Sequence, residues 1–329
     1  MGLIAGSSPI PETYAGPRAW WPLDEAVHAV TLERDLRGDK MLAAAHIAWE
    51  VEKRPVFYPT GVPLEAVKIP GFVAVVRGSD DACLGLVSPS YHLFQNRDMV
   101  RVTDAVLDEG GAHYHTAGSL HGGQIVWTLA KFDRTIHVKG DGSPIEDYLL
   151  ALTGHDGRHQ LTFVNTNIRV WCGNTASAAL RGASNRIGLR HTPGMGARIG
   201  EIRTALDLHF RYADRLESFL NDLADRPMTL EEVCAFTEVL IPKSPDVERS
   251  PRTDQKRRLL VDVFRNSPNL QDLPLTAYRT YQATVEWADH AVPYRDSSRF
   301  AGADRRAAAI IERGADDLKS RAAALLSKP

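Results

Sequence analysis

The segment Gly154–Leu180 reads GHDGRHQLTFVNTNIRVWCGNTASAAL. Its centre alternates as a β-strand does, so residues two apart share a face. One face carries Thr162, Val164, Thr166, Ile168, Val170 and Cys172, and the other carries Phe163, Asn165, Asn167, Arg169 and Trp171. Polar groups are costly to bury in a dry core, whereas amides, cations and aromatic rings together suit an anionic, planar partner. We therefore expect the second face to bind nucleic acid.

A structural role for the same side chains is the alternative. Asn165, Asn167 and Arg169 can satisfy backbone groups and a carboxylate such as Asp147 or Asp156 at a junction between sheet and helix. In that case Arg169→Ala unfolds the protein. If the face binds a ligand, the variant folds and loses affinity.

Strand and turn signals continue upstream of this segment. We expect strands over 47–59 and 71–77, a turn at 78–81 and a hairpin over 113–132. Three more strands follow, with turns at 140–142 and 156–157. The apolar spacing of 96–109 predicts a helix that the Gly110–Gly111 pair ends.

Downstream of the segment the pattern becomes helical. Asn174 or Thr175 can cap a short helix over 176–183, and a long amphipathic helix is expected over 198–223. Thr229 and Glu232 have the spacing of a capping box, and further helices are expected at 251–265, 275–290 and 303–327. The predicted fold is α+β: a mostly antiparallel, twisted β-sheet packed with helices, followed by an all-helical C-terminal region.

Three regions follow from this order. Residues 1–25 are rich in Pro, Gly and Ser and predict an irregular N-terminal arm. Residues 26–225 form the α+β core domain, and residues 226–329 form the helical C-terminal region. The proline-rich stretch 241–251 is the best linker candidate.

Composition limits the class of protein. The chain has 329 residues, 43% of them hydrophobic and 24% charged, with a net charge of −2, as in ordinary globular proteins. The net charge excludes a uniformly basic nucleic-acid binder but not a local basic face. The sequence contains no apolar run long enough to span a membrane and no secretory signal, and its three cysteines lie far apart. We expect a cytoplasmic protein without membrane contact.

Catalytic and metal-binding patterns are weak. His113 and His115 share a strand face, and His155 and His159 form an HxxxH pair, but no carboxylate pattern completes a metal site. Cys172 lacks the sequence context of a cysteine nucleophile. Phosphate-binding glycine motifs are absent. We expect no catalytic residue, no metal and no cofactor.

Basic residues gather after the opening segment. The loop 180–194 contains Arg181, Arg186 and Arg190 and no acid. Arginine recognises phosphate through its two-pronged guanidinium, so these side chains are candidate phosphate contacts. A second basic run, 249–265, is more typical of a solvated helix face.

Several motifs in order carry a family resemblance. They are LGLVSPSYHLFQN (84–96), TAGSLHGGQIVWTLAK (116–131), DYLLALTGHDGRHQ (147–160), TNIRVWCGNTASAAL (166–180), RHTPG (190–194) and TAYRTYQATVEWADH (276–290). Together they resemble the phage/plasmid-like family classed as a domain of unknown function, over most of residues 45–325. In this chain Arg158 stands where a small polar residue is expected in that family. The resemblance implies residence on mobile elements.

The leading functional hypothesis is a single-stranded DNA-binding protein, as in Rad52-like annealing and recombination proteins. Such a protein needs no catalytic residue and commonly works as a homo-oligomer. The candidate nucleic-acid-binding residues are Arg158, Asn165, Asn167, Arg169, Trp171, Asn174, Arg181, Arg186 and Arg190.

Two alternatives stay open. One is a metal-dependent nuclease or hydrolase centred on the GHDGRH turn, with His155, Asp156, His159 and Asn174. Its activity would require a divalent metal and disappear in Asp156→Ala. The other is a protein-binding module that counteracts a host defence, which would bind a host protein and have little affinity for DNA.

Overall fold

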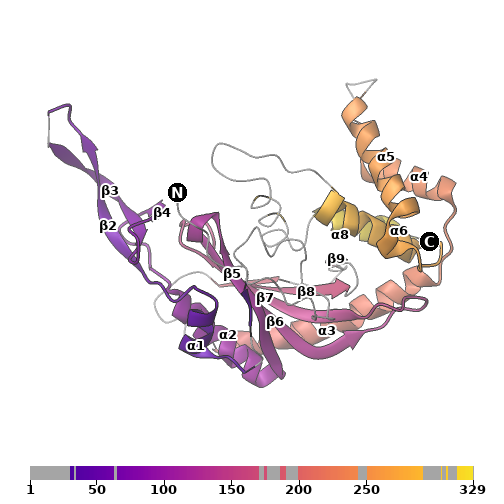
Figure 1. Cartoon of the computed structure of the whole chain (residues 1–329), viewed down its shortest axis with the longest axis horizontal. Coiled ribbons are helices and arrows are strands. Elements are labelled where there is room, and N and C mark those ends of the chain that lie inside the picture. Colours follow the sequence, from indigo (N-terminus) through magenta and orange to yellow (C-terminus); the bar gives the residue numbers. More distant parts are fainter. Residues whose placement is uncertain are drawn as a thin grey trace.

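The computed structural model describes residues 30–32, 35–62, 65–169, 174–175, 186–189, 199–243, 250–291, 305, 309 and 317–328. Within them the chain forms two antiparallel sheets and a set of helices that dominates the C-terminal part, which confirms the α+β class (Figure 1). The predicted arm over 1–25 and the short helix over 176–183 lie outside the described residues. No described helix is long and apolar enough to cross a membrane.

The main sheet is built from seven antiparallel strands. Their order is β1-β5-β6-β7-β8-β10, and β9 also pairs with β8. The strands are β1 (Val30–Thr31), β5 (Ala112–Leu120), β6 (Ile125–Ile136), β7 (Ile145–Gly154), β8 (Leu161–Arg169), β9 (Asn174–Thr175) and β10 (Arg186–Leu189). The four long central strands agree with the sequence pattern, but the separate strand expected before the 140–142 turn is wrong, because β6 continues to Ile136 and the long strands that follow it are β7 and β8. The short strands β1, β9 and β10 are too brief to show a period, and Asn174 and Thr175, expected to cap a helix, form β9 instead.

Turn chemistry sets the limits of these strands. Gly111 ends α2 in the left-handed conformation, at φ 65°, which favours glycine. Gly157 has φ 78° and closes the turn between β7 and β8. Both positions agree with the glycine signals in the sequence.

Helices cover one face of the main sheet. The helix α1 (Gly38–Ala44) packs on α2 (Asn96–Gly110), which contacts β5, β6 and β7, while α3 (Ile199–Ala224) contacts α2 and β8. Figure 1 shows α3 lying along the sheet. The core between them includes Met99, Phe132 and Phe163.

A second core joins α3 to the C-terminal helices. These are α4 (Leu230–Leu240), α5 (Pro251–Asn266), α6 (Ala277–Glu286) and α8 (Asp317–Leu326), with the 3-10 turn η3 (Pro268–Leu270). Leu216 and Leu220 of α3 belong to the same buried cluster as Tyr281 of α6 and Ala322 of α8. The predicted capping box of α4 is present, since Thr229 accepts from the amide of Glu232 and Glu232 accepts from the amide of Thr229.

The last two predicted helices differ from the structure. The helix expected over 275–290 begins at Ala277, ends as an α-helix at Glu286 and continues as one π-helical turn, η4 (Trp287–Ala291). From the helix expected over 303–327, the structure describes α8 over 317–326 and single helical positions at 305 and 309. Asp289 of the π turn pairs with Lys319 of α8, 2.5 Å apart and buried. This contact depends on tertiary packing, which local sequence does not reveal.

The second sheet is a ribbon that projects from the body (Figure 1). It consists of β2 (Val51–Pro59), β3 (Ala66–Arg77) and β4 (Cys83–Val87) in that order. Val51, Val75, Leu84 and Val87 form a small buried cluster at its base. Sequence reasoning began β3 at Gly71 and so missed its first five residues, where Pro70 and Gly71 disguise the strand.

Candidate nucleic-acid interface

The central strand β8 has the alternation predicted from its sequence. Leu149 of β7 lies opposite Asn165, and Asp147 lies opposite Asn167, so the two amides share the face that holds Phe163. At these two positions the face is not open to a ligand, because Asn165 is 4% exposed and Asn167 is fully buried. The expectation that Asn165 and Asn167 contact nucleic acid is therefore wrong, since both are buried where α2 contacts β7 and α3 contacts β8.

Asn167 has a structural partner there. Its side-chain amide donates a 2.7 Å hydrogen bond to Oδ1 of Asp147, on the neighbouring strand. A buried carboxylate needs such a donor. This is the contact that the structural interpretation of the segment anticipated for Asp147.

The arginine and asparagine positions instead gather at one edge of the sheet. Strand β7 occupies one side of β8, and both β9 and β10 pair with its other side. Arg169 lies opposite Asn174, and Arg186 lies opposite Val164. Arg169, Asn174 and Arg186, which come from three strands, thus follow one strand edge, which we call the β8 edge.

Arg158 lies at the end of this edge. It is an exposed residue in the turn between β7 and β8, and its amide donates to Oδ1 of Asp156 at 2.9 Å. From this turn to Arg169 the edge spans one nine-residue strand, roughly 30 Å. The remaining candidates Trp171, Arg181 and Arg190 lie outside the described residues.

His155 of the GHDGRH turn serves as a buried junction. It is 2% exposed, and its Nε2 lies 2.9 Å from Oδ1 of Asn96, at the start of α2. Asn96 in turn donates to the carbonyls of Ile47 and Trp49. The ring of Trp49 packs edge-on against His155 at 5.3 Å. This contact set joins the main sheet, α2 and the base of the ribbon.

Asp156 and His159 form a half-buried pair beside it. Nδ1 of His159 lies 3.1 Å from Oδ1 of Asp156, which also accepts from two turn amides. Burial raises the pKa of Asp156, but hydrogen bonds from His159 and the turn amides outweigh this and leave the pKa below its usual range. The carboxylate is therefore engaged in shaping the turn. No group of three metal-ligating side chains occurs among the residues that the structure describes.

A polar cluster on the opposite face of the sheet was missed by sequence reasoning. The ammonium of Lys131 and the hydroxyl of Tyr148 both donate to Glu146, the latter at 2.6 Å. The ring of His115 stacks edge-on against Tyr148 at 5.4 Å, and burial lowers the pKa of His115 to about 4. The shared face of His113 and His115 was visible in the sequence, but the cross-strand partners depend on register, which was not.

The described part of the second basic run falls on α5 and divides by exposure. Arg257 is turned inward and donates to the carbonyls of Ile241 and Glu238, where α4 ends. The other cations of the helix, Arg252, Lys256, Arg258 and Arg265, are exposed. Their placement agrees with a solvated helix face.

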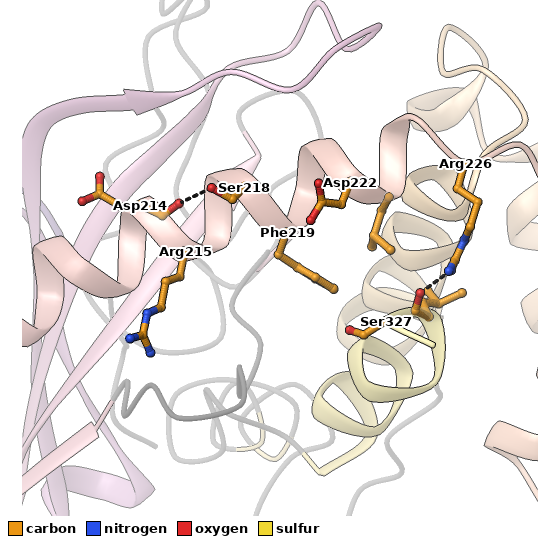
Figure 2. A pocket seen from close by; sticks show the side chains of 9 residues that line it. Asp214, Arg215, Ser218, Phe219, Asp222, Arg226 and Ser327 are labelled. Carbon is orange, nitrogen blue, oxygen red and sulfur yellow. Dashed lines mark hydrogen bonds between the residues drawn. The ribbon is translucent and has the colours of Figure 1, made fainter. Parts of the chain in front are cut away.

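A cavity of about 430 Å³ lies between α3 and α8 (Figure 2). Its charged lining is balanced between Asp214 and Asp222 on one hand and Arg215 and Arg226 on the other. The guanidinium of Arg226 donates to the carbonyls of Leu326 and Lys328 and so caps α8. Because the charges of the lining are balanced and Arg226 is engaged by α8, nothing in this cavity favours binding of a polyanion.

Comparison with known proteins identifies a family. The family model described as "Domain of unknown function (DUF932)" matches residues 83–311, which is more than half of the chain. No curated protein and no solved structure matches the chain. The predicted resemblance to a domain of unknown function is thus confirmed, while residence on mobile elements stays a prediction. The chain belongs to the family of the Domain of unknown function (DUF932).

Proposed function

We propose that this protein binds single-stranded nucleic acid, DNA in preference, along the β8 edge. The observation that carries the proposal is the pairing of β9 and β10 with the same side of β8, which brings the backbone positions of Arg169, Asn174 and Arg186 to one edge. Arg158, exposed in the turn before the same strand, adds a cation at the end of this edge. Arginine positions spaced along an extended edge suit the regular phosphates of an extended strand.

Burial of Asn165 and Asn167 narrows the site. Both amides are buried, and that of Asn167 bonds to Asp147 on the neighbouring strand. The proposed interface therefore consists of Arg158, Arg169, Asn174 and Arg186, together with Trp171, Arg181 and Arg190 on the evidence of the sequence alone. It is a binding surface without catalytic groups.

The mechanism follows from this composition. Arginines would hold the phosphates, and binding would release counterions, so affinity would fall steeply with salt. Held by its backbone, a strand keeps its bases free to meet a complementary strand, which is the requirement for annealing. A homo-oligomer would extend the row of phosphate contacts from one subunit to the next.

Fluorescence anisotropy with labelled single- and double-stranded DNA, across a salt series without metal, tests the proposal. Each phosphate contact contributes about 0.7 to the slope of log K against log salt for a single strand, so Arg158→Ala with Arg186→Ala should reduce the slope by about 1.4. Arg252→Ala with Lys256→Ala, on the exposed face of α5, is the matched control and should leave the slope unchanged. Absence of binding by the wild type at low salt would overturn the proposal.

The same protein preparation addresses the two alternatives. Cleavage that requires a divalent metal and is lost in folded Asp156→Ala would favour the hydrolase. Capture of a defined host protein without affinity for DNA would favour the partner-binding module.

A further inference from the structure

The projecting ribbon concentrates the exposed apolar surface of the described chain. Of ten large hydrophobic side chains that are exposed there, six lie between Phe57 and Leu86. The three aromatic ones, Phe57, Tyr58 and Phe72, are each about half exposed, at 52%, 50% and 52%. Exposed apolar groups that gather on one element, unlike ones scattered singly, mark interaction sites in soluble proteins.

The aromatic rings emerge on both faces of a narrow strand pair. Phe57 lies opposite Lys68 and Tyr58 lies opposite Val67, so consecutive residues of β2 present one ring to each face. Phe72 lies where the register shifts, next to Gly71, whose φ of 78° bends the strand. A ribbon with rings on both faces differs from a flat protein-docking surface, which is apolar on one side.

At the base of the ribbon the arginine side chains are engaged in ion pairs within the protein. Arg54 pairs with Glu52 and Asp81, and Arg77 pairs with Asp80 while its guanidinium stacks over Trp49 at 5.3 Å. Further out, Lys68 is exposed beside Phe57 and enters no ion pair within the described part of the chain. The outer ribbon thus offers a cation next to a ring.

We propose that Phe57, Tyr58 and Phe72 stack on the bases of a single strand while Lys68 contacts a phosphate. Aromatic platforms flanked by cations bind single strands without sequence preference, because every base has a stacking face. This inference rests on the proposed function, and it adds a base-contacting element to an edge that holds phosphates. The strands β2 and β3 precede residue 83, where the family match begins.

The test compares matched ribbon variants of the full chain by anisotropy on labelled oligothymidylate and on an abasic strand of equal length. Stacking of one base contributes about 1–3 kcal/mol, so Phe57→Ala with Tyr58→Ala and Phe72→Ala should weaken binding at least about tenfold, without changing the salt slope. The variant should also lose the preference for the base-bearing strand. Lys68→Gln should lower the slope by about 0.7. The matched control is the double variant Val62→Ala with Val67→Ala, which loses exposed aliphatic groups of the same ribbon. It should bind with the affinity of the wild type.

The outcomes separate the two proposals. Wild-type binding that the aromatic variant leaves unchanged overturns the ribbon inference and leaves the β8 edge standing. Should the aromatic variant retain its affinity but lose self-association, or lose binding to phosphatidylglycerol vesicles, the ribbon is a subunit or lipid contact and the inference is wrong. A wild-type protein without affinity for single strands overturns both. Circular dichroism and the melting temperature confirm that each variant is folded, as expected for exposed positions.

Discussion

Replacing Asn96 by alanine should destabilise the protein through the junction between the main sheet, α2 and the ribbon. The side chain is 2% exposed and makes three hydrogen bonds: 2.9 Å to Nε2 of His155, 2.9 Å to the carbonyl of Ile47 and 3.3 Å to that of Trp49. Each such bond contributes about 1 kcal/mol net, and alanine leaves the buried ring nitrogen without this partner. We therefore expect a loss of about 2–4 kcal/mol in the free energy of unfolding.

Urea unfolding followed by tryptophan fluorescence measures this loss. An m-value equal to that of the wild type would show that the substitution leaves the denatured state unchanged. Asn266→Ala is the matched control, because that asparagine is exposed at the end of α5 and its bond to Asp262 lies in solvent. It should change the unfolding free energy by less than about 0.5 kcal/mol.

A double-mutant cycle with His155→Phe assigns the effect to the junction. Phenylalanine keeps a ring beside Trp49 and removes the nitrogen that faces Asn96, so the two substitutions should show a coupling of about 1 kcal/mol. A loss below about 0.5 kcal/mol for Asn96→Ala, or no coupling, would refute the reasoning and free His155 for a catalytic role.

Three further predictions concern stability. Burial lowers the pKa of His115 from 6.5 to about 4, so between these pH values the unfolded state binds up to one proton more than the folded state. As pH drops from 6.5 to 4, the free energy of unfolding of the wild type should therefore fall by about 3 kcal/mol relative to that of His115→Gln. Urea titrations of both proteins at each pH measure this difference. Equal pH dependence of both proteins would contradict this. Lys319→Met should lower the free energy of unfolding by about 3–5 kcal/mol, because it leaves Asp289 buried without its ammonium partner. The double variant Lys319→Met with Asp289→Leu should recover most of this loss. If the effects of the two substitutions simply add, the two residues are not a coupled pair. Thr229→Ala should cost about 1 kcal/mol by removing the cap of α4, measured by thermal melting, and an unchanged melting temperature would show that packing alone holds that end.

Local signals were sufficient wherever a residue acts on its own neighbours. The alternation of 161–169, the glycine stop at Gly111 and the capping box at Thr229 each concern contacts within a few residues, and each agrees with the structure. The short strands β9 and β10 carry no such signal, because two to four residues form a strand only where β8 offers an edge.

The candidate site divides in the same way. Sequence alone identified the residue types, namely the arginines and asparagines around β8, and the alternative role for Asn167 beside Asp147. It could not tell which face of β8 is covered, because period-two alternation specifies two faces without saying what packs on each. The exposed rings of the ribbon were overlooked because a Phe or Tyr in a strand is ordinarily a core residue.

The sequence by itself determined the α+β class, the long strands and helices and the kinds of side chain near β8, because these depend on propensity and spacing along the chain. Only the tertiary structure decided that Asn165 and Asn167 are buried, that Arg169, Asn174 and Arg186 follow one edge and that Phe57, Tyr58 and Phe72 stand in solvent. Burial and register arise from contacts between residues distant in sequence, and their free energies are properties of the assembled fold.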